Sequence, residues 1–402
     1  MAERPLRILF LTFYYRPDLC AGSFRATPLA NELARLVPEG STIDVITTEP
    51  NRYHSFNADS PSVQDNAGIS IYRVALPRHQ SGMFDQSKAF AVYAKGVLAR
   101  VAQRDYDLVF ATSSRLMTAA LGAWVARRKR ARLYLDIRDI FADTIGEVLP
   151  RSLAWLVRPV FSATERFAVR GADRVNLVSA GFADYFRSRY PGQRFSFHTN
   201  GVDDEFIVSA AASVDARATR RPNASVRVLY AGNLGDGQGL HAIVPALAKR
   251  LAPRVTFHIV GDGGRKRDLE AELTKLGVSN VELSPPMNRN ELLAAYRRAD
   301  VLFVHLNNLD AFKKVLPSKV FEYAALGKPV WAGVAGFAAE FVRTEIANAA
   351  VFPPCDVDAA FAAFETLRLE DTPRPGFVAK YARTNINAAM ANEIIAVGAA
   401  SS

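Results

Sequence analysis

Three loops of this chain combine glycine with polar or charged residues in a way that suits a phosphorylated ligand. Glycine lets backbone N–H groups approach an anion closely, and a neighbouring cation offsets the charge of the anion. The loop that begins at Gly232 lacks the lysine of a P-loop and the glycine spacing of a dinucleotide motif. We expect a diphosphate site, with a plain turn as the alternative for the first glycine. The candidate positions are Gly22, then Gly232 and Asn233, then Gly261, Arg265 and Lys266.

A fourth loop, residues 317–323, combines a helix cap, a cation and a carboxylate. Ser318 is predicted to cap a short helix whose N–H groups, together with Lys319, surround an anion. A capping box would place Glu or Gln at position 321, which is Phe321. Glu322 can instead accept hydrogen bonds from the vicinal hydroxyls of a ribose, and the alternative is a glutamate that only complements the helix dipole.

Asp139 is the leading candidate for a catalytic group in the first half of the chain. It closely follows an apolar run at residues 133–137, and Arg138 beside it is expected to contact the acceptor. The carboxylate could act as a base or orient the acceptor, and capping of the next helix is an equal alternative. His258 and His305 lie in strand patterns and are expected to be structural, so no histidine is assigned to catalysis.

The sequence shows no metal-binding carboxylate pair at the end of an apolar strand. Asp356 and Asp358 have the Asp-x-Asp spacing, but they follow two prolines late in the chain. The two cysteines, Cys20 and Cys355, are too few and too far apart for a disulfide framework or a zinc site. We expect chemistry that needs no metal and no other cofactor.

The elements that position these residues alternate short β-branched runs with helical patterns, which is typical of parallel α/β sheets. The rhythm stops and then restarts, which predicts two Rossmann-like domains. The expected strands are residues 8–13, 43–47, 69–76, 108–111, 133–137 and 175–178, and then 226–230, 255–260, 281–284, 301–305 and 330–332.

Thr27 and Pro28 are predicted to begin the first crossover helix, because proline suits the first helical position. The alternation weakens between residues 200 and 223, where we place the linker. An alanine-rich apolar pattern near the end predicts a terminal helix. The predicted parts are residues 1–200, residues 201–378 and a C-terminal helix at residues 379–402 that packs back on the first domain.

Fifty lysines and arginines against 40 acidic residues give a formal charge of +10. This excess favours nucleotides, an anionic membrane surface or nucleic acid as partners. The basic cluster at residues 127–132 indicates a solvated helix end, with membrane or nucleic-acid contact as alternatives, and the pattern at residues 153–168 suits a buried amphipathic helix or a membrane-facing one. The longest apolar stretch, residues 117–126, is too short to span a bilayer. We expect a cytoplasmic protein that associates peripherally with the inner face of the plasma membrane.

Six segments match a known family when taken together and in order: residues 14–18 with Gly22, 138–141, 200–203, 230–233, 260–263 and 317–329. With these segments the chain resembles glycosyltransferase family 4, in particular bacterial members that build cell-surface polysaccharides. The likeness spans nearly the whole chain. It implies the GT-B fold, in which an acceptor-binding N-terminal domain and a nucleotide-sugar-binding C-terminal domain face each other across a cleft.

The resemblance also implies roles for individual residues. Glu322 would bind the ribose of the donor, with the base resting near Met287, while Ser318, Lys319 and the loop at Gly232 would bind the diphosphate. It implies a UDP-sugar donor and retention of anomeric configuration, with the acceptor hydroxyl attacking on the face that the diphosphate leaves.

The chain departs from the family pattern at three positions around the donor. The family commonly has a glutamate eight residues before the one matching Glu322, and this position is Lys314. It also commonly has an arginine and a lysine in the glycine loop, where this chain has Asn233 and Gln238. The cations expected to neutralise the leaving diphosphate instead are Lys319, Arg265 and Lys266.

The sequence thus predicts a retaining, metal-independent glycosyltransferase that moves a sugar from a nucleotide diphosphate donor to a glycan or lipid-linked acceptor. The nucleotide sugar would be a substrate, an anionic membrane surface a further partner, and nucleic acid no partner. Two alternatives stay open. One is a nucleotide-sugar epimerase on the same fold, and the other is a non-catalytic basic protein that binds polyanions.

Overall fold

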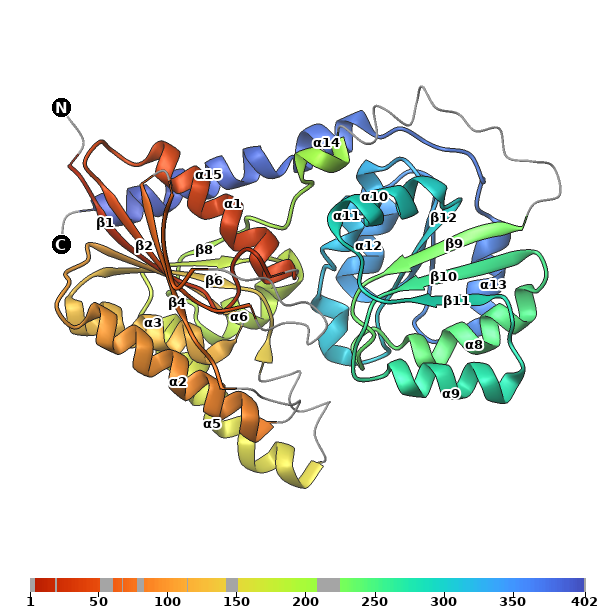
Figure 1. Cartoon of the computed structure of the whole chain (residues 1–402), viewed down its shortest axis with the longest axis horizontal. Helices are drawn as coiled ribbons and strands as arrows, with labels where there is room; N and C mark the ends of the chain where they lie inside the picture. The colour runs from red at the N-terminus through yellow and green to blue at the C-terminus, as the bar shows by residue number, and fades with distance from the viewer. Residues whose placement is uncertain are drawn as a thin grey trace. The chain divides into compact units, whose positions relative to one another are not determined.

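The structure, a computed structural model, describes residues 4–18, 20–50, 61–66, 68–77, 83–113, 115–141, 151–207 and 225–400. The chain divides into two compact units (Figure 1). Unit 1 contains the chain up to Thr199 together with residues from Thr384 onward, and unit 2 contains Asn200–Arg383. Within the described ranges, every helix is too short or too polar to serve as a membrane span.

Unit 1 is built on an eight-stranded sheet in the order β3-β4-β2-β1-β5-β6-β7-β8. All neighbouring strands run parallel except β3 and β4, which are antiparallel. Ile8 in the central strand lies opposite Ile43 on one side and Leu108 on the other. The strands are β1 (Arg7–Leu11), β2 (Thr42–Thr48), β3 (Val63–Asn66), β4 (Ile69–Val74), β5 (Leu108–Thr112), β6 (Arg132–Ile137), β7 (Arg174–Leu177) and β8 (Phe195–Ser196).

Helices cover both faces of this sheet, so its central strands are continuous apolar runs rather than alternating ones. On one face, α1 and α15 pack on β1, β2 and β5, and α2, α3 and α5 lie on the other (Figure 1). The helices are α1 (Ala21–Leu36), α2 (Met83–Val101), α3 (Leu116–Lys129), α5 (Arg151–Arg170), α6 (Ala183–Arg189) and α15 (Arg383–Ala399), with a 3-10 turn η1 (Ala180–Phe182) before α6.

Unit 2 is built on a six-stranded, fully parallel sheet in the order β11-β10-β9-β12-β13-β14. One apolar cluster joins the sheet to α8, α9 and α13, and a second joins it to α10, α11, α12 and α14. The strands are β9 (Val226–Ala231), β10 (Val255–Val260), β11 (Val281–Ser284), β12 (Val301–His305), β13 (Val330–Gly333) and β14 (Ala349–Phe352). The helices are α8 (Leu240–Leu251), α9 (Lys266–Leu276), α10 (Arg289–Arg298), η2 (Asp310–Lys314, 3-10), α11 (Lys319–Ala325), α12 (Gly336–Glu345), α13 (Val357–Glu365) and α14 (Pro375–Tyr381).

All eleven expected strands are present, within about two residues at each end, whereas β3, β8 and β14 were not expected. The prediction that Thr27 and Pro28 begin the first helix is wrong, because α1 already begins at Ala21 and Pro28 lies inside it. The Thr27 hydroxyl instead accepts a hydrogen bond from the N–H of Arg16 in the preceding loop. Glycine at position 22 permits the early start, since a Cβ there would lie 3.2 Å from the Cβ of Tyr14.

The loops that follow β9 and β10 cross in direct backbone contact. Gly261 has φ of +149°, and a Cβ on it would lie 1.8 Å from the carbonyl oxygen of Gly232. Hydrogen bonds from Gly232 N–H to the Val260 carbonyl and from Leu234 N–H to the Asp262 carbonyl join the two loops. Glycine is therefore required at position 261, and the two glycine loops form one rigid unit at the carboxyl edge of the sheet.

The predicted return of the C-terminal helix to the first unit is confirmed. Met390 lies in the apolar cluster of β1 and α1, and Glu393 accepts hydrogen bonds from Tyr134 at 2.7 Å and pairs with His198 at 3.1 Å and Arg174 at 3.2 Å. Burial raises the pKa of Glu393, but the hydrogen bonds from His198, Tyr134 and Ser196 and the charge of Arg174 outweigh burial and lower this pKa to about 2.

Both unit boundaries are close to the predicted ones, although most of the predicted linker, residues 208–223, lies outside the described residues. The first boundary falls after Thr199 rather than residue 200, and the second after Arg383 rather than residue 378. The second shift has a clear cause, because Ala382 forms a parallel β-bridge with Val202 and so belongs to unit 2.

We expect Glu393→Gln to lower the free energy of unfolding by about 2 kcal/mol at pH 7, because it removes a carboxylate that the folded state stabilises. The folded-state pKa of about 2 lies below the ordinary value of 4.5, so this contribution is complete well above pH 4.5 and is lost as pH falls toward 2. Urea unfolding of the full chain should therefore show a smaller difference between variant and wild type at pH 3.5 than at pH 7. Glu32→Gln is the control, because it removes only an exposed pair with Arg35 and should change stability little. A difference that does not depend on pH would contradict this assignment.

Candidate functional site

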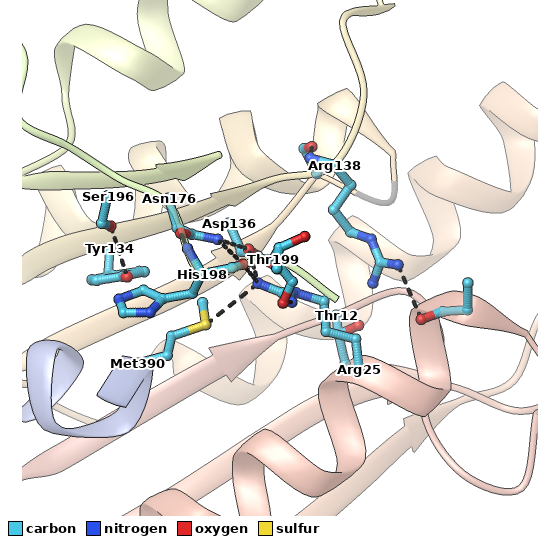
Figure 2. Close-up of polar contacts among 12 residues, drawn as sticks. Thr12, Arg25, Tyr134, Asp136, Arg138, Asn176, Ser196, His198, Thr199 and Met390 are labelled. Carbon is cyan, nitrogen blue, oxygen red and sulfur yellow. Dashed lines mark hydrogen bonds and ion pairs between the residues drawn. The ribbon is translucent and has the colours of Figure 1, made fainter. Parts of the chain in front are cut away.

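Unit 1 contains an ion pair between Arg25 and Asp136, each with 2% of its side chain exposed. The guanidinium donates from Nε to Oδ2 at 2.8 Å and from Nη2 to Oδ1 at 2.9 Å (Figure 2). Burial raises the pKa of Asp136, but the charge and hydrogen bonds of Arg25 outweigh it and hold the pKa below its ordinary value. Asp136 is therefore an ionised carboxylate in the interior, and it ties α1 to β6.

The same guanidinium also binds the segment that leads out of unit 1. Arg25 donates to the carbonyl oxygens of His198 at 2.7 Å and Thr199 at 2.8 Å. Asn176 on β7 donates to Asp136 at 2.7 Å and accepts from the His198 N–H at 2.6 Å, as Figure 2 shows. These bonds satisfy the remaining polar groups around the buried pair, which is what makes its burial tolerable.

Arg138 and Asp139 lie just beyond β6, at the carboxyl edge where the sequence predicted them. Arg138 donates from its backbone N–H to the Ser113 hydroxyl at 2.8 Å and from its guanidinium to the Ala21 carbonyl at 3.0 Å. It therefore reaches the first turn of α1, so Gly22, which the sequence placed in a loop, is a helical residue. Part of the Asp139 side chain is exposed, yet the surrounding protein raises its pKa to about 6, while the charge of Arg138 acts in the opposite direction.

In unit 2, Lys319 extends from α11 to the loop after β9, which contains Gly232. A Cβ on Gly232 would lie 2.5 Å from Cε and 3.4 Å from Nζ of Lys319. The amine therefore lies against the backbone of the loop after β9, in space that only glycine leaves open. Removal of water lowers the pKa of Lys319, and the charge of Glu322 partly offsets this effect.

Asn233 and Gln238, two of the three departures from the family pattern, bind each other. Asn233 Nδ2 donates to Gln238 Oε1 at 2.9 Å, and Gly235 N–H donates to the same oxygen at 3.3 Å. Tyr230 fixes the loop further by donating to the Asn233 carbonyl at 2.7 Å. A neutral, internally bonded pair thus takes the positions of two cations.

His305 holds the other end of this loop and is structural, as predicted. Its Nε2 accepts from the Cys355 N–H at 3.0 Å, so Nδ1 carries the proton and donates to the Gln238 carbonyl at 2.6 Å. Burial lowers the pKa of His305 to about 4, which keeps the ring neutral at physiological pH.

Arg265 and Lys266 are placed at the start of α9, but their charges are already matched. Arg265 donates to Asp236 at 2.5 Å and to Asp268 at 2.7 Å, and Lys266 lies 3.9 Å from Glu270. These bonds leave Lys319 as the better placed of the three predicted cations.

Glu322 lies one turn into α11 with 8% of its surface exposed, and it accepts a weak hydrogen bond from the Tyr296 hydroxyl at 3.4 Å. Tyr296 is fully buried and packs edge-on against Tyr323. The charge of Glu322 also acts on Arg289 and on Lys319. Glu322 is therefore within electrostatic range of both cations.

Ser318 directly precedes α11, but its predicted capping bond is absent. Its backbone is helical (φ −59°, ψ −30°), and the Pro317 carbonyl takes the Val320 N–H that a cap would have bound. Met287 is half-buried in the segment between β11 and α10 and packs against the apolar core that contains α10 and α11. Lys314 ends η2, directly before the 315–318 segment.

Sequence reasoning missed Arg25, Asp136, Arg289 and Asp203. Asp136 gave one signal, because it is the acidic residue in the otherwise apolar end of a predicted strand. Arg25 and Arg289 gave no such signal, since the residues around them are like those around an arginine on the surface of a helix. Within the described ranges, no three side chains of histidine, cysteine, aspartate or glutamate gather as a metal site would require.

Comparison with known proteins identifies both halves of the chain. The model of the glycosyl transferase 4-like domain matches residues 25–201, and the model of glycosyl transferases group 1 matches residues 214–385. The chain is 28% identical over 209 residues to the Escherichia coli K12 protein named "Putative colanic acid biosynthesis glycosyl transferase WcaI". This match covers 50% of the chain and 51% of that protein, so it spans about half the length of the curated relative.

Solved structures resemble the chain over nearly its whole length. Sucrose-phosphate synthase from Thermosynechococcus elongatus has a TM-score of 0.67 at 15% identity, covering 97% of this chain and 94% of that one. HepE from Anabaena, in complex with UDP and glucose, has a TM-score of 0.61 at 18% identity, covering 98% and 97%. WaaG, a glycosyltransferase involved in lipopolysaccharide biosynthesis, has a TM-score of 0.64 at 15% identity, covering 96% and 95%. These identities show the shared fold alone.

The two family models match most of the chain in the expected order, and the whole chain shares the GT-B fold of these structures, so the protein belongs to the GT-B glycosyltransferases of the family 4 type.

Proposed function

We propose that this protein is a retaining, metal-independent glycosyltransferase that transfers a sugar from a UDP-sugar to a glycan or lipid-linked acceptor in the synthesis of a cell-surface polysaccharide. The observation that carries the proposal is that Lys319 of α11 lies against Gly232, while Glu322 of the same helical turn is close enough for its charge to act on Lys319. A hydrogen-bond acceptor for the ribose hydroxyls and a cation thus lie within one turn of α11, and the cation lies against the backbone of Gly232.

On the donor side, the partly buried Glu322 carboxylate would accept hydrogen bonds from both ribose hydroxyls. The base would rest on the half-buried Met287, and the diphosphate would lie along Gly232 and Gly261, with the hydroxyl of Ser318 within the same loop cluster. Lys319 would neutralise the diphosphate as negative charge develops on it. A cation fixed at that position lowers the barrier to departure without any reorganisation during the reaction.

On the acceptor side, Asp139 of unit 1 would bind the acceptor hydroxyl, and Arg138 beside it would complete the acceptor surface. The bond from the anomeric carbon to the diphosphate oxygen breaks and its electron pair leaves with the diphosphate. The acceptor oxygen forms the new bond, and Asp139 takes its proton. No protein nucleophile, metal or other cofactor is needed in this scheme.

The relatives support the choice of donor and pathway. One solved neighbour is a complex with UDP and glucose, and the curated relative is named for colanic acid biosynthesis. The complex points to a UDP-sugar as the donor of this chain, and the name of the curated relative points to a polysaccharide as its product.

We expect Glu322→Ala to weaken UDP binding by about 10- to 100-fold, because it removes two hydrogen bonds to a charged acceptor. The measurement is the thermal shift with UDP, GDP, dTDP and CMP sugars, with and without EDTA. Wild type should respond to UDP-sugars whether or not EDTA is present. Glu340→Ala, an exposed position on α12, is the matched control and should bind like wild type. A complete lack of response to any nucleotide would favour a polyanion-binding protein instead, and donor conversion without any acceptor would favour an epimerase.

The rate of transfer should depend on pH through two groups. Asp139 must be ionised to act as a base, so activity should fall as pH drops below its pKa of about 6. Lys319 must be protonated, and its lowered pKa means that donor affinity should fall at a lower alkaline pH than an ordinary lysine would give. Profiles of kcat/KM against pH for wild type and Asp139→Asn test this. An acid limb that survives unchanged in Asp139→Asn would contradict the assignment.

We further propose that unit 1 associates peripherally with an anionic membrane through α3 and α5, which pack side by side. Trp155 of α5 is 80% exposed and Trp124 of α3 is 47% exposed, so α5 is not the buried helix that the sequence favoured over a membrane-facing one. The acid of α5, Glu165, is buried and accepts hydrogen bonds from Tyr185 and Tyr190, and the sequence of α3 contains no acid. The exposed side chains of this α3–α5 surface are Met117, Trp124, Arg127, Arg128, Trp155, Arg158, Val160, Arg166, Phe167 and Arg170. Exposed aromatic and basic side chains together suit an anionic lipid interface.

The pure protein should therefore bind vesicles that contain anionic phosphatidylglycerol at low salt, and binding should weaken at 0.5 M salt (roughly a 4 Å screening length). Trp124→Ser combined with Trp155→Ser should reduce binding about tenfold or more in vesicle sedimentation, because two interfacial anchors are lost. Val63→Ser, at an exposed apolar position on β3, is the control. Equal binding by the double variant and wild type, or no binding to anionic vesicles at low salt, would exclude this surface.

A further inference from the structure

Three consecutive carbonyls of the loop after β9 accept hydrogen bonds from residues at the carboxyl end of β12. His305 Nδ1 donates to the Gln238 carbonyl at 2.6 Å. Asn307 donates twice, from its backbone N–H to the Gly237 carbonyl at 2.9 Å and from its side-chain Nδ2 to the Asp236 carbonyl at 2.9 Å. The carbonyls of residues 236–238 therefore all face the end of β12, and this segment is held from one side.

Cys355 fixes the orientation of both donating side chains. Its N–H donates to His305 Nε2 at 3.0 Å, so the proton of the neutral ring lies on Nδ1. Asn307 Oδ1 accepts from the Asn308 N–H at 2.8 Å and from the Cys355 thiol at 3.4 Å, so Nδ2 is the end of the amide that faces the loop. Cys355 has φ of +62°, which is uncommon for a residue with a side chain, and with this backbone both its N–H and its thiol reach the pair.

Glycines leave the space that these two side chains occupy. A Cβ on Gly333 would lie 2.2 Å from Cδ2 of His305, and a Cβ on Gly239 would lie 3.1 Å from Cγ of Asn307. The His305 side chain is buried, and its ring stacks on Phe303. His305 and Asn307 therefore have little room to turn away from the loop.

The bond from Asn307 to the Asp236 carbonyl determines where the Gly237 N–H points. In a trans peptide the C=O and N–H groups point in opposite directions, so this N–H points away from the Asn307 side chain. The next two N–H groups of the loop turn back to the Gly235 carbonyl, at 3.2 and 3.4 Å. Within the part of the chain that the structure describes, no protein group accepts a hydrogen bond from the half-buried Gly237 N–H.

We propose that His305 and Asn307 are positioning residues for the donor, because they hold residues 236–238 so that the Gly237 N–H donates to the diphosphate of the bound nucleotide. This inference rests on the proposed role of the loop at Gly232 in binding that diphosphate. Both side chains act through the loop, and neither is assigned contact with the reacting atoms.

A backbone donor held in this way suits a loop whose side chains are neutral. Asn233 and Gln238 bind each other and bring no charge to the diphosphate. A hydrogen bond from an N–H group to an ionised phosphate oxygen is stronger than one between neutral groups. Because the direction of the Gly237 N–H is fixed before the nucleotide arrives, binding requires no reordering of this segment.

Asn307→Ala tests the positioning role, because it removes the bond to the Asp236 carbonyl and leaves the backbone bond to the Gly237 carbonyl in place. The Kd for UDP should rise about tenfold, since one charge-assisted hydrogen bond to the diphosphate is lost or weakened. The Kd for uridine, which has no phosphate, should stay within about twofold of wild type, since none of its own hydrogen bonds is removed. Calorimetric titration of the full chain with UDP and with uridine measures both values.

Asn308→Ala is the matched control, a neighbouring exposed asparagine whose side chain makes no hydrogen bond within the described residues, and both Kd values should equal those of wild type. His305→Leu removes the bond to the Gln238 carbonyl and should give the same selective loss, so it carries the test if Asn307→Ala does not fold.

The ratio of the Kd for uridine to the Kd for UDP separates positioning from a merely structural role. An unchanged ratio in the folded variants would overturn the positioning role, whether the two Kd values match those of wild type or rise together. Failure of the wild-type protein to bind UDP would instead overturn the proposed function, and the positioning role with it.

Discussion

The buried pair of Arg25 and Asp136 is the constraint on which unit 1 depends. An isolated charge at 2% exposure would cost several kcal/mol, and the pair is tolerated because two short hydrogen bonds, two carbonyls and Asn176 satisfy every side of it. Removing one partner would leave the other charge unpaired in the core. As a result, the start of α1 and the end of β6 keep a fixed relation, and this relation lets Arg138 reach the Ala21 carbonyl beside Gly22.

In unit 2 the two glycine loops are fixed by direct backbone contact. Gly261 lies against the Gly232 carbonyl, so the two loops have no room for side chains where they cross. A family arginine and lysine are replaced by Asn233 and Gln238, which bind each other, while Lys319 brings a cation to the same loop from a different helix. The loop at Gly232 thus combines a neutral, internally bonded pair with a cation that comes from α11.

The sequence predicts the strands well because parallel strands buried on both faces must be continuous apolar runs, as at residues 108–112. It predicts the glycine loops for a related reason, since close backbone contact admits few residue types. It does not predict the start of α1, because Thr27 and Pro28 lie inside the helix and Thr27 bonds the preceding loop instead of capping. It also misses Arg25, Asp203 and Arg289, whose partners lie 111, 180 and 86 residues away along the chain, so no local pattern marks them.

The chain passes between the units twice, and an arginine holds the backbone close to each crossing. Arg25 holds the carbonyl of Thr199, the last residue of unit 1 before the first passage, and Arg383 holds the carbonyl of Gly201 just after it. On the return, Arg383 is itself the last residue of unit 2, and Met390 of α15 already contacts Arg25. A guanidinium on each side thus limits the unanchored backbone of the first passage to the bonds around Asn200. These two anchors, Arg25 and Arg383, are themselves held by ion pairs, with Asp136 in unit 1 and with Asp203 in unit 2.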